Sequence, residues 1–135
     1  MASAGVWDLY AELGELDRSG LSDAERAVFA ICDLRQEVNS GGFDSYFRYW
    51  AGDTAPTAHA ELPAVLGQGW ADLLRDAMAL LGPAYPSGAG ARAAALDARD
   101  FDAELSALDD RFYELEAGVD ADSRLGALLH DDEDA

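Results

Sequence analysis

Carboxylates are the commonest chemically active side chains in this sequence. The 135 residues include 27 Asp and Glu but only 9 Arg and no Lys, so the formal net charge is −18. At this density carboxylate pairs are unavoidable, and no single pair indicates general acid–base catalysis. So acidic a surface excludes a general contact with nucleic acid phosphates, which needs clustered basic residues. It also excludes binding to anionic lipid through a basic face.

The other reactive side chains form no known catalytic or metal-binding pattern. His59 and Glu61 give a His-x-Glu pair, but the downstream cysteine pair of a zinc deaminase is missing, and the second histidine, His130, lies in an acidic tail. Cys32 falls on the apolar side of a helical pattern, which predicts a buried, unreactive thiol. The sequence has no His-Glu-x-x-His, Gly-x-Ser-x-Gly, Walker or calcium-loop motif. We therefore expect a protein that is not an enzyme, with no catalytic residues, metal or cofactor.

Helical spacing of apolar residues runs through nearly the whole chain. A capping box formed by Ser22 and Glu25 opens the second helix, and Pro63 is expected to bend or interrupt a later one. Loops are expected at 52–56 and 82–90. The predicted helices cover about residues 5–18, 22–39, 43–50, 57–66, 69–82, 91–97 and 100–117, followed by a weak final turn at 125–129.

These elements predict an all-α protein with one compact domain of about five to seven helices. Half of the residues are hydrophobic, which is enough to fill a core despite the charge. The domain is expected to span residues 1–129, and the acidic tail 130–135 is expected to be disordered. No apolar run is long enough to cross a bilayer, and the first residues lack the features of a signal peptide. We therefore expect a cytoplasmic protein without membrane contact.

The turn after the second helix is the most specific local pattern. Its two glycines permit backbone conformations that a side chain would forbid, and its aromatic residues recur at helical spacing. The favoured interpretation is a core wedge that includes Trp50; the alternative is a small-molecule site or active site around Tyr46, Tyr49 and Trp50. The motif consists of Asn39, Gly41, Gly42, Phe43, Tyr46 and Phe47.

Together with the block Leu108-Asp109-Asp110-Arg111-Phe112-Tyr113, this turn resembles the acidic DNA-mimic proteins founded on DNA mimic protein 19. The resemblance covers about residues 22–118. Many members carry Gln where Ser45 stands and Asn where Tyr49 stands, so the chain departs from the pattern at two positions. The resemblance implies an all-helical fold. For the founding type it also implies a negative face that occupies the DNA site of a helix-turn-helix regulator.

The charge is concentrated toward the C-terminus. Residues 97–135 hold 14 acidic residues and 3 Arg, a net charge of −11. The stripe from Phe101 to Leu115 is expected to face the core, which leaves carboxylates along a helix about 27 Å long. This length corresponds to about eight base-pair steps. The candidate partner-binding residues are Asp102, Glu104, Asp109, Asp110, Glu114 and Glu116.

Three functions are compatible with these observations. In the first, the acidic face occupies the basic surface of a DNA-binding protein, without direct contact to nucleic acid. In the second, the chain is an immunity or antitoxin-like protein that neutralises a basic toxin or nuclease. In the third, it is an acidic helical domain without a mimic role, whose acidity favours solubility. The sequence leaves a homodimer open.

Overall fold

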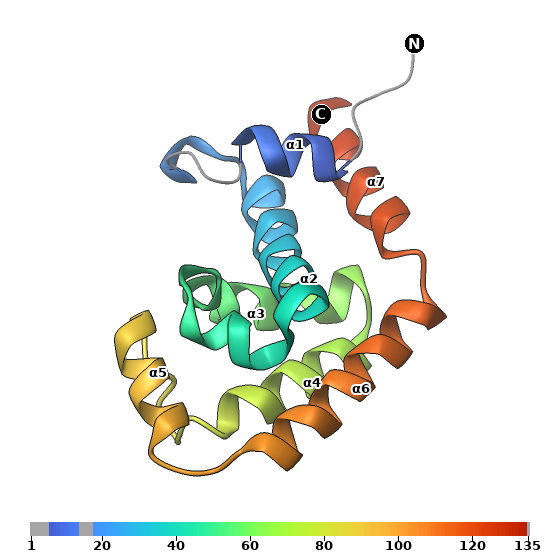
Figure 1. The fold of residues 1–135 in the computed structure, drawn as a ribbon. Helices are drawn as coiled ribbons and strands as arrows, with labels where there is room; N and C mark the ends of the chain where they lie inside the picture. The colour runs from blue at the N-terminus through green and yellow to red at the C-terminus, as the bar shows by residue number, and fades with distance from the viewer. Residues whose placement is uncertain (1–5, 14–17, 135) are drawn as a thin grey trace.

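Every regular element of the chain is a helix in residues 6–13 and 18–134, the ranges that the computed structural model describes (Figure 1). The prediction of an all-α fold with five to seven helices is therefore confirmed. Two short 3₁₀ helices, η1 and η2, join the α-helices. In chain order the elements are α1 (Val6–Leu13), η1 (Arg18–Gly20), α2 (Asp23–Arg48), η2 (Trp50–Thr54), α3 (Ala55–Val65), α4 (Gln68–Ala79), α5 (Ala89–Asp97), α6 (Asp102–Gly118) and α7 (Ala121–Asp134).

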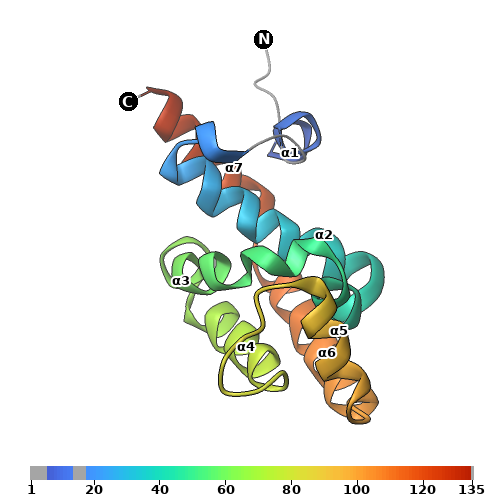
Figure 2. The same cartoon turned by 90° about the vertical axis from the view of Figure 1, so that its left-hand side faces the viewer.

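Helix α2 runs through the middle of the molecule, and most other helices pack against it (Figures 1 and 2). Helix α7 lies along its N-terminal part together with α1, and α6 packs against α2 and α4. The predicted capping box is present, because the Ser22 hydroxyl accepts from the Glu25 N–H and the Glu25 carboxylate accepts from the Ser22 N–H. The sequence therefore locates the start of this central helix correctly.

A sharp bend at Gly42 divides α2 into two parts. Gly42 has φ 74° and ψ −178°, which lies in the region that favours glycine. The predicted end of a helix near Asn39 to Gly42 is thus confirmed, although the helix reaches Gly41 before it breaks. Beyond the bend, three rings have no exposed surface and form the centre of the core: Phe43, Tyr46 and Phe47.

Trp50 does not belong to this aromatic wedge, and its prediction as a core residue is wrong. Helix α2 ends at Arg48, and the extended backbone of Tyr49 (φ −114°, ψ 177°) redirects the chain. As a result Trp50 is 48% exposed and Tyr49 60% exposed. The helical spacing that placed Trp50 on the wedge stops applying one residue earlier.

The loop predicted at 52–56 is instead η2 followed directly by the start of α3. Long-range contacts hold this segment: the Tyr85 hydroxyl donates to the Gly52 carbonyl at 2.6 Å, and buried Arg92 donates to the Asp53 carboxylate at 2.6 Å. Helix α3 continues through Pro63 to Val65, so the proline does not interrupt it. The loop predicted at 82–90 lies between α4 and α5, and α5 begins within its last residues.

The two ends of the chain differ most from expectation. The predicted helix 5–18 is α1, which ends at Leu13; residues 14–17 lie outside the described residues, and η1 follows. The weak turn predicted at 125–129 is a full helix, α7, because Ala121, Leu125 and Leu129 are buried at intervals of four residues. The sequence underestimates the length of this helix because the small side chain of Ala121 contributes little to the apolar pattern. The helix includes residues 130–134, so the acidic segment begins inside it.

Replacing Gly42 by alanine should strongly destabilise the fold. A Cβ atom at this position would overlap the Asp109 carboxylate, and a positive φ costs a non-glycine residue roughly 1–2 kcal/mol by itself. We expect Gly42→Ala to lower the free energy of unfolding by at least about 2 kcal/mol in urea titrations. Gly90→Ala is the matched control, because a Cβ there meets nothing within 4 Å and the residue lies in α5. It should be neutral or stabilising; equal stability of the two variants would contradict the role assigned to the bend.

Candidate acidic interaction face

Helix α6 carries the six predicted partner-binding carboxylates, and the structure separates them into two groups. Four side chains are exposed and have no hydrogen-bond or ion-pair partner among the described residues. The other two are half-buried and make contacts with α2. The exposed group is Asp102, Glu104, Asp110 and Glu114, and the half-buried group is Asp109 and Glu116.

The exposed carboxylates are spread over the solvent-facing half of α6. At about 100° per residue, Asp110 and Glu114 are neighbours opposite the buried stripe. Asp102 and Glu104 lie on the two flanks of the helix. Leu105, Leu108 and Phe112 are buried on the opposite side, as the apolar stripe predicts. At 1.5 Å per residue, Asp102 and Glu114 are separated by about 18 Å along the helix axis. Glu104 precedes Arg111 by seven residues and therefore lies on the same side of α6. Arg111 pairs with Asp76 of α4 at 3.0 Å. We call Asp102, Glu104, Asp110 and Glu114 the α6 face.

Asp109 has a structural contact that its sequence position does not reveal. Its Oδ1 accepts a hydrogen bond from the Phe43 N–H at 2.9 Å, just after the bend of α2. The carboxylate thus caps the second part of α2 in the way that an N-cap residue satisfies a free N–H group. Burial raises the pKa of Asp109 and outweighs the opposing effect of this hydrogen bond; nearby Asp110 and Asp44 raise it further.

Glu116 is held by an arginine on α2. The Arg35 guanidinium donates to both Glu116 oxygens, at 2.5 and 3.0 Å, and to Asp122 of α7 at 2.7 Å. The Arg35 side chain is only 7% exposed, and its guanidinium carbon lies 5.2 Å from the centre of the Trp7 ring. This cluster joins α1, α2, α6 and α7, so Glu116 is committed to the fold.

The arginines are largely used inside the molecule. Seven of the nine form an ion pair with at least one Asp or Glu among the described residues. Arg92 has no exposed surface and also donates to the carbonyls of Phe47, Tyr49 and Pro86. None of these ion pairs involves a carboxylate of the α6 face, whose negative charge is therefore uncompensated by direct pairing.

Sequence reasoning missed the buried charges that organise this arrangement. Asp33 is completely buried and accepts hydrogen bonds from the Tyr10 hydroxyl, the Thr54 hydroxyl and the Arg18 guanidinium, all within 2.9 Å. The sequence does contain a signal for these buried charges, because Asp33 and Arg35 interrupt an otherwise apolar run in the middle of α2. A charge inside such a run indicates a buried partner elsewhere.

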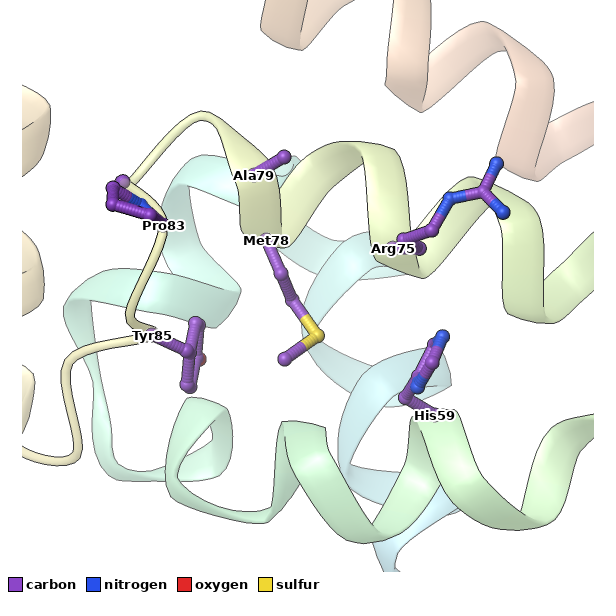
Figure 3. Close-up of a pocket in the computed structure, with 7 residues that line it drawn as sticks. His59, Arg75, Met78, Ala79, Pro83 and Tyr85 are labelled. Atoms are coloured by element: carbon purple, nitrogen blue, oxygen red, sulfur yellow. The ribbon is translucent and has the colours of Figure 1, made fainter.

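A cleft between α3 and α4 contains the one histidine whose side chain the structure describes. His59 lies opposite Arg75 and Met78 at the rim of a cavity of about 240 Å³, closed at one end by Pro83 and Tyr85 (Figure 3). Among the described residues, those that line this cavity include no carboxylate or thiol.

Cys32 has no exposed surface, and burial raises its pKa to about 12, so the predicted burial is confirmed. Within 6–13 and 18–134, no group of three potential ligands could hold a metal ion. No helix in the described part of the chain is both long and apolar enough to cross a membrane.

A family model described as DMP19-like protein matches residues 19–131. The match includes the bend of α2 and the whole α6 face, and it extends beyond residues 22–118, the approximate range of the resemblance in the sequence. Helix α1 precedes the matched range. Neither a curated protein nor a solved structure gives a significant match.

The role of Asp109 can be tested by comparing two substitutions. Asp109→Ala removes the acceptor of the Phe43 N–H and should destabilise the protein by about 1 kcal/mol. Asp109→Asn keeps an acceptor oxygen and removes a charge that burial disfavours, so it should be clearly the more stable variant at pH 7. Chemical denaturation at a series of pH values measures both effects.

The pH dependence has a defined sign. Because the folded protein raises the pKa of Asp109, protonation favours the folded state. Wild type should therefore gain stability relative to Asp109→Asn as the pH falls through the folded pKa toward the unfolded value. The opposite trend, or equal stability of the alanine and asparagine variants at pH 7, would contradict this assignment.

Proposed function

Because the chain belongs to the family of DMP19-like proteins, we propose that it is a non-enzymatic DNA mimic. Its α6 face binds the basic DNA-binding surface of a protein partner such as a helix-turn-helix transcription regulator. The family membership supports a DNA-mimic-like protein in general. The partner class and the residues are inferred from the chemistry of the face.

The observation that carries this proposal is that four carboxylates of α6 are exposed and have no basic neighbours that pair with them. Asp110 and Glu114 repel each other, since like charges four residues apart destabilise a helix by a few tenths of a kcal/mol. Surface arginines pair with other surface carboxylates, for example Arg26 with Asp23 and Arg75 with Asp72. No ion pair of the described residues includes a carboxylate of the α6 face, which leaves the face available to cations of a partner.

The rigidity of α6 supports the same proposal. A mimic must present its charges without a large loss of conformational entropy on binding. Asp109 and Glu116 attach one side of α6 to α2, and Arg111 attaches the other side to α4. The exposed carboxylates therefore stand on a helix that is fixed on both flanks.

The double variant Asp110→Asn/Glu114→Gln should weaken binding to a basic partner. The measurement is displacement of a fluorescent duplex from a panel of purified helix-turn-helix regulators of the host, followed by anisotropy. Wild type should displace the duplex from at least one regulator, and its affinity should fall steeply between low and physiological salt. The variant should bind at least about tenfold more weakly, since removing interfacial charges that meet cations costs more than 1.4 kcal/mol in total.

The matched control is Asp23→Asn/Glu61→Gln, which removes the same charge from exposed positions on α2 and α3. It should retain wild-type displacement and the same salt dependence. If both double variants lose affinity equally, total charge rather than the α6 face mediates binding. Failure of wild type to displace DNA from any regulator would contradict the proposed partner class.

A further inference from the structure

A second surface, distant in sequence from the α6 face, combines aromatic rings with a carboxylate. It is a cavity of about 400 Å³ between α1, the middle of α2 and the start of η2. This volume falls in the range of small-ligand sites and also suits one long side chain. Its lining residues are Trp7, Tyr10, Ala11, Gln36, Glu37 and Trp50.

The carboxylate in this cavity, Glu37, can accept further hydrogen bonds. Glu37 Oε2 accepts from the Ser45 hydroxyl at 2.8 Å, while Oε1 has no hydrogen-bond partner among the described residues. Trp50 is 48% exposed although it is a large hydrophobic residue. The cavity therefore presents the exposed part of the Trp50 ring, which Arg18 also contacts, and a free carboxylate oxygen to the same space.

The walls of this cavity already hold arginines by the same combination of groups. The Arg18 guanidinium lies 5.3 Å from the centre of the Trp50 ring and is bound by the Asp33 carboxylate at 2.7 and 2.9 Å. Arg35 lies 5.2 Å from the centre of the Trp7 ring and is bound by Glu116. In both cases a planar guanidinium stacks on an aromatic face while a carboxylate accepts its N–H groups.

From this repeated arrangement we propose that the cavity is a receptor for one arginine side chain of a protein partner. The incoming guanidinium stacks on Trp50 and donates to Glu37 Oε1. Arg18 does not oppose this binding with a full charge, because its bidentate contact with buried Asp33 neutralises it. The inference rests on the proposed function only in assuming a basic protein partner, and it deepens that function by adding a specific contact to a diffuse electrostatic one.

The cavity also lies across the boundary of the family match. Glu37 and Trp50 belong to the matched residues 19–131, whereas the α1 wall with Trp7 and Tyr10 precedes them. The α6 face supplies none of the lining residues. The arginine receptor and the α6 face can therefore be tested independently.

The test is a titration of the ¹⁵N-labelled full chain with N-acetyl-arginine amide, and with N-acetyl-lysine amide at the same ionic strength. The indole N–H signal of Trp50 should shift with the arginine probe, while that of Trp70, which is 3% exposed in the core, should not. Arginine should bind at least about threefold more tightly than lysine, which corresponds to a stacking contribution of roughly 0.7 kcal/mol.

Two pairs of variants make the result specific. Trp50→Ala and Glu37→Gln should each weaken arginine binding at least about threefold. Tyr49→Ala, an exposed aromatic outside the cavity, and Glu61→Gln should leave it unchanged. Far-UV circular dichroism checks that each variant is folded, and glutamine at position 37 can still accept from Ser45.

Equal binding of the lysine probe, or unchanged arginine binding in Trp50→Ala and Glu37→Gln, would overturn the proposal. So would an equal loss of arginine binding in Asp110→Asn/Glu114→Gln, because that result indicates general attraction of cations. Failure of DNA displacement by the α6 face bears only on the proposed function, since the probe titration needs no partner.

Discussion

The contact between Asp109 and the bend of α2 is the constraint on which the rest of the structure depends. Gly42 turns the central helix so that the aromatic residues after it enter the core. Directly after the bend, the Phe43 N–H donates to Asp109 of α6. The approach is possible only because Gly42 has no Cβ, which would occupy the position of the carboxylate. Gly42, the aromatic wedge and Asp109 therefore depend on one another, and their contact fixes the position of α6 against α2.

That constraint decides which carboxylates are available at the surface. Asp109 and Glu116 lie on the side of α6 nearest α2, where one caps a helix and the other binds Arg35. Their neighbours farther around the helix remain exposed. The acidic residues of α6 therefore have two roles that composition cannot distinguish, since a charge of −18 contains both structural and uncompensated groups. Only the uncompensated group can attract a partner without breaking the fold.

Local patterns in the sequence predicted the features whose causes are local. The spacing of apolar residues located the helices, and the Ser22–Glu25 box located the start of α2 because both partners lie within one turn. The prediction of a loop at 52–56 is wrong because η2 is held by contacts with Arg92 and Tyr85, which are more than 30 residues away in the sequence. Periodicity places Asp109 in the partner-binding group because it gives only the direction of a side chain, and a residue at the edge of a stripe can contact either solvent or a neighbouring helix.

Arg35 connects the two surfaces proposed to contact a partner. On one side it binds Glu116 at the end of α6, and on the other it stacks on Trp7, whose indole N–H donates to Asp122 at 2.9 Å. Helix α1 is therefore attached to the family-matched domain by the same ion-pair cluster that attaches α6. Because both surfaces share this rigid support, the distance between them is fixed. A single partner that reaches both surfaces would form the second contact at a high effective concentration, so that two modest contacts reinforce each other.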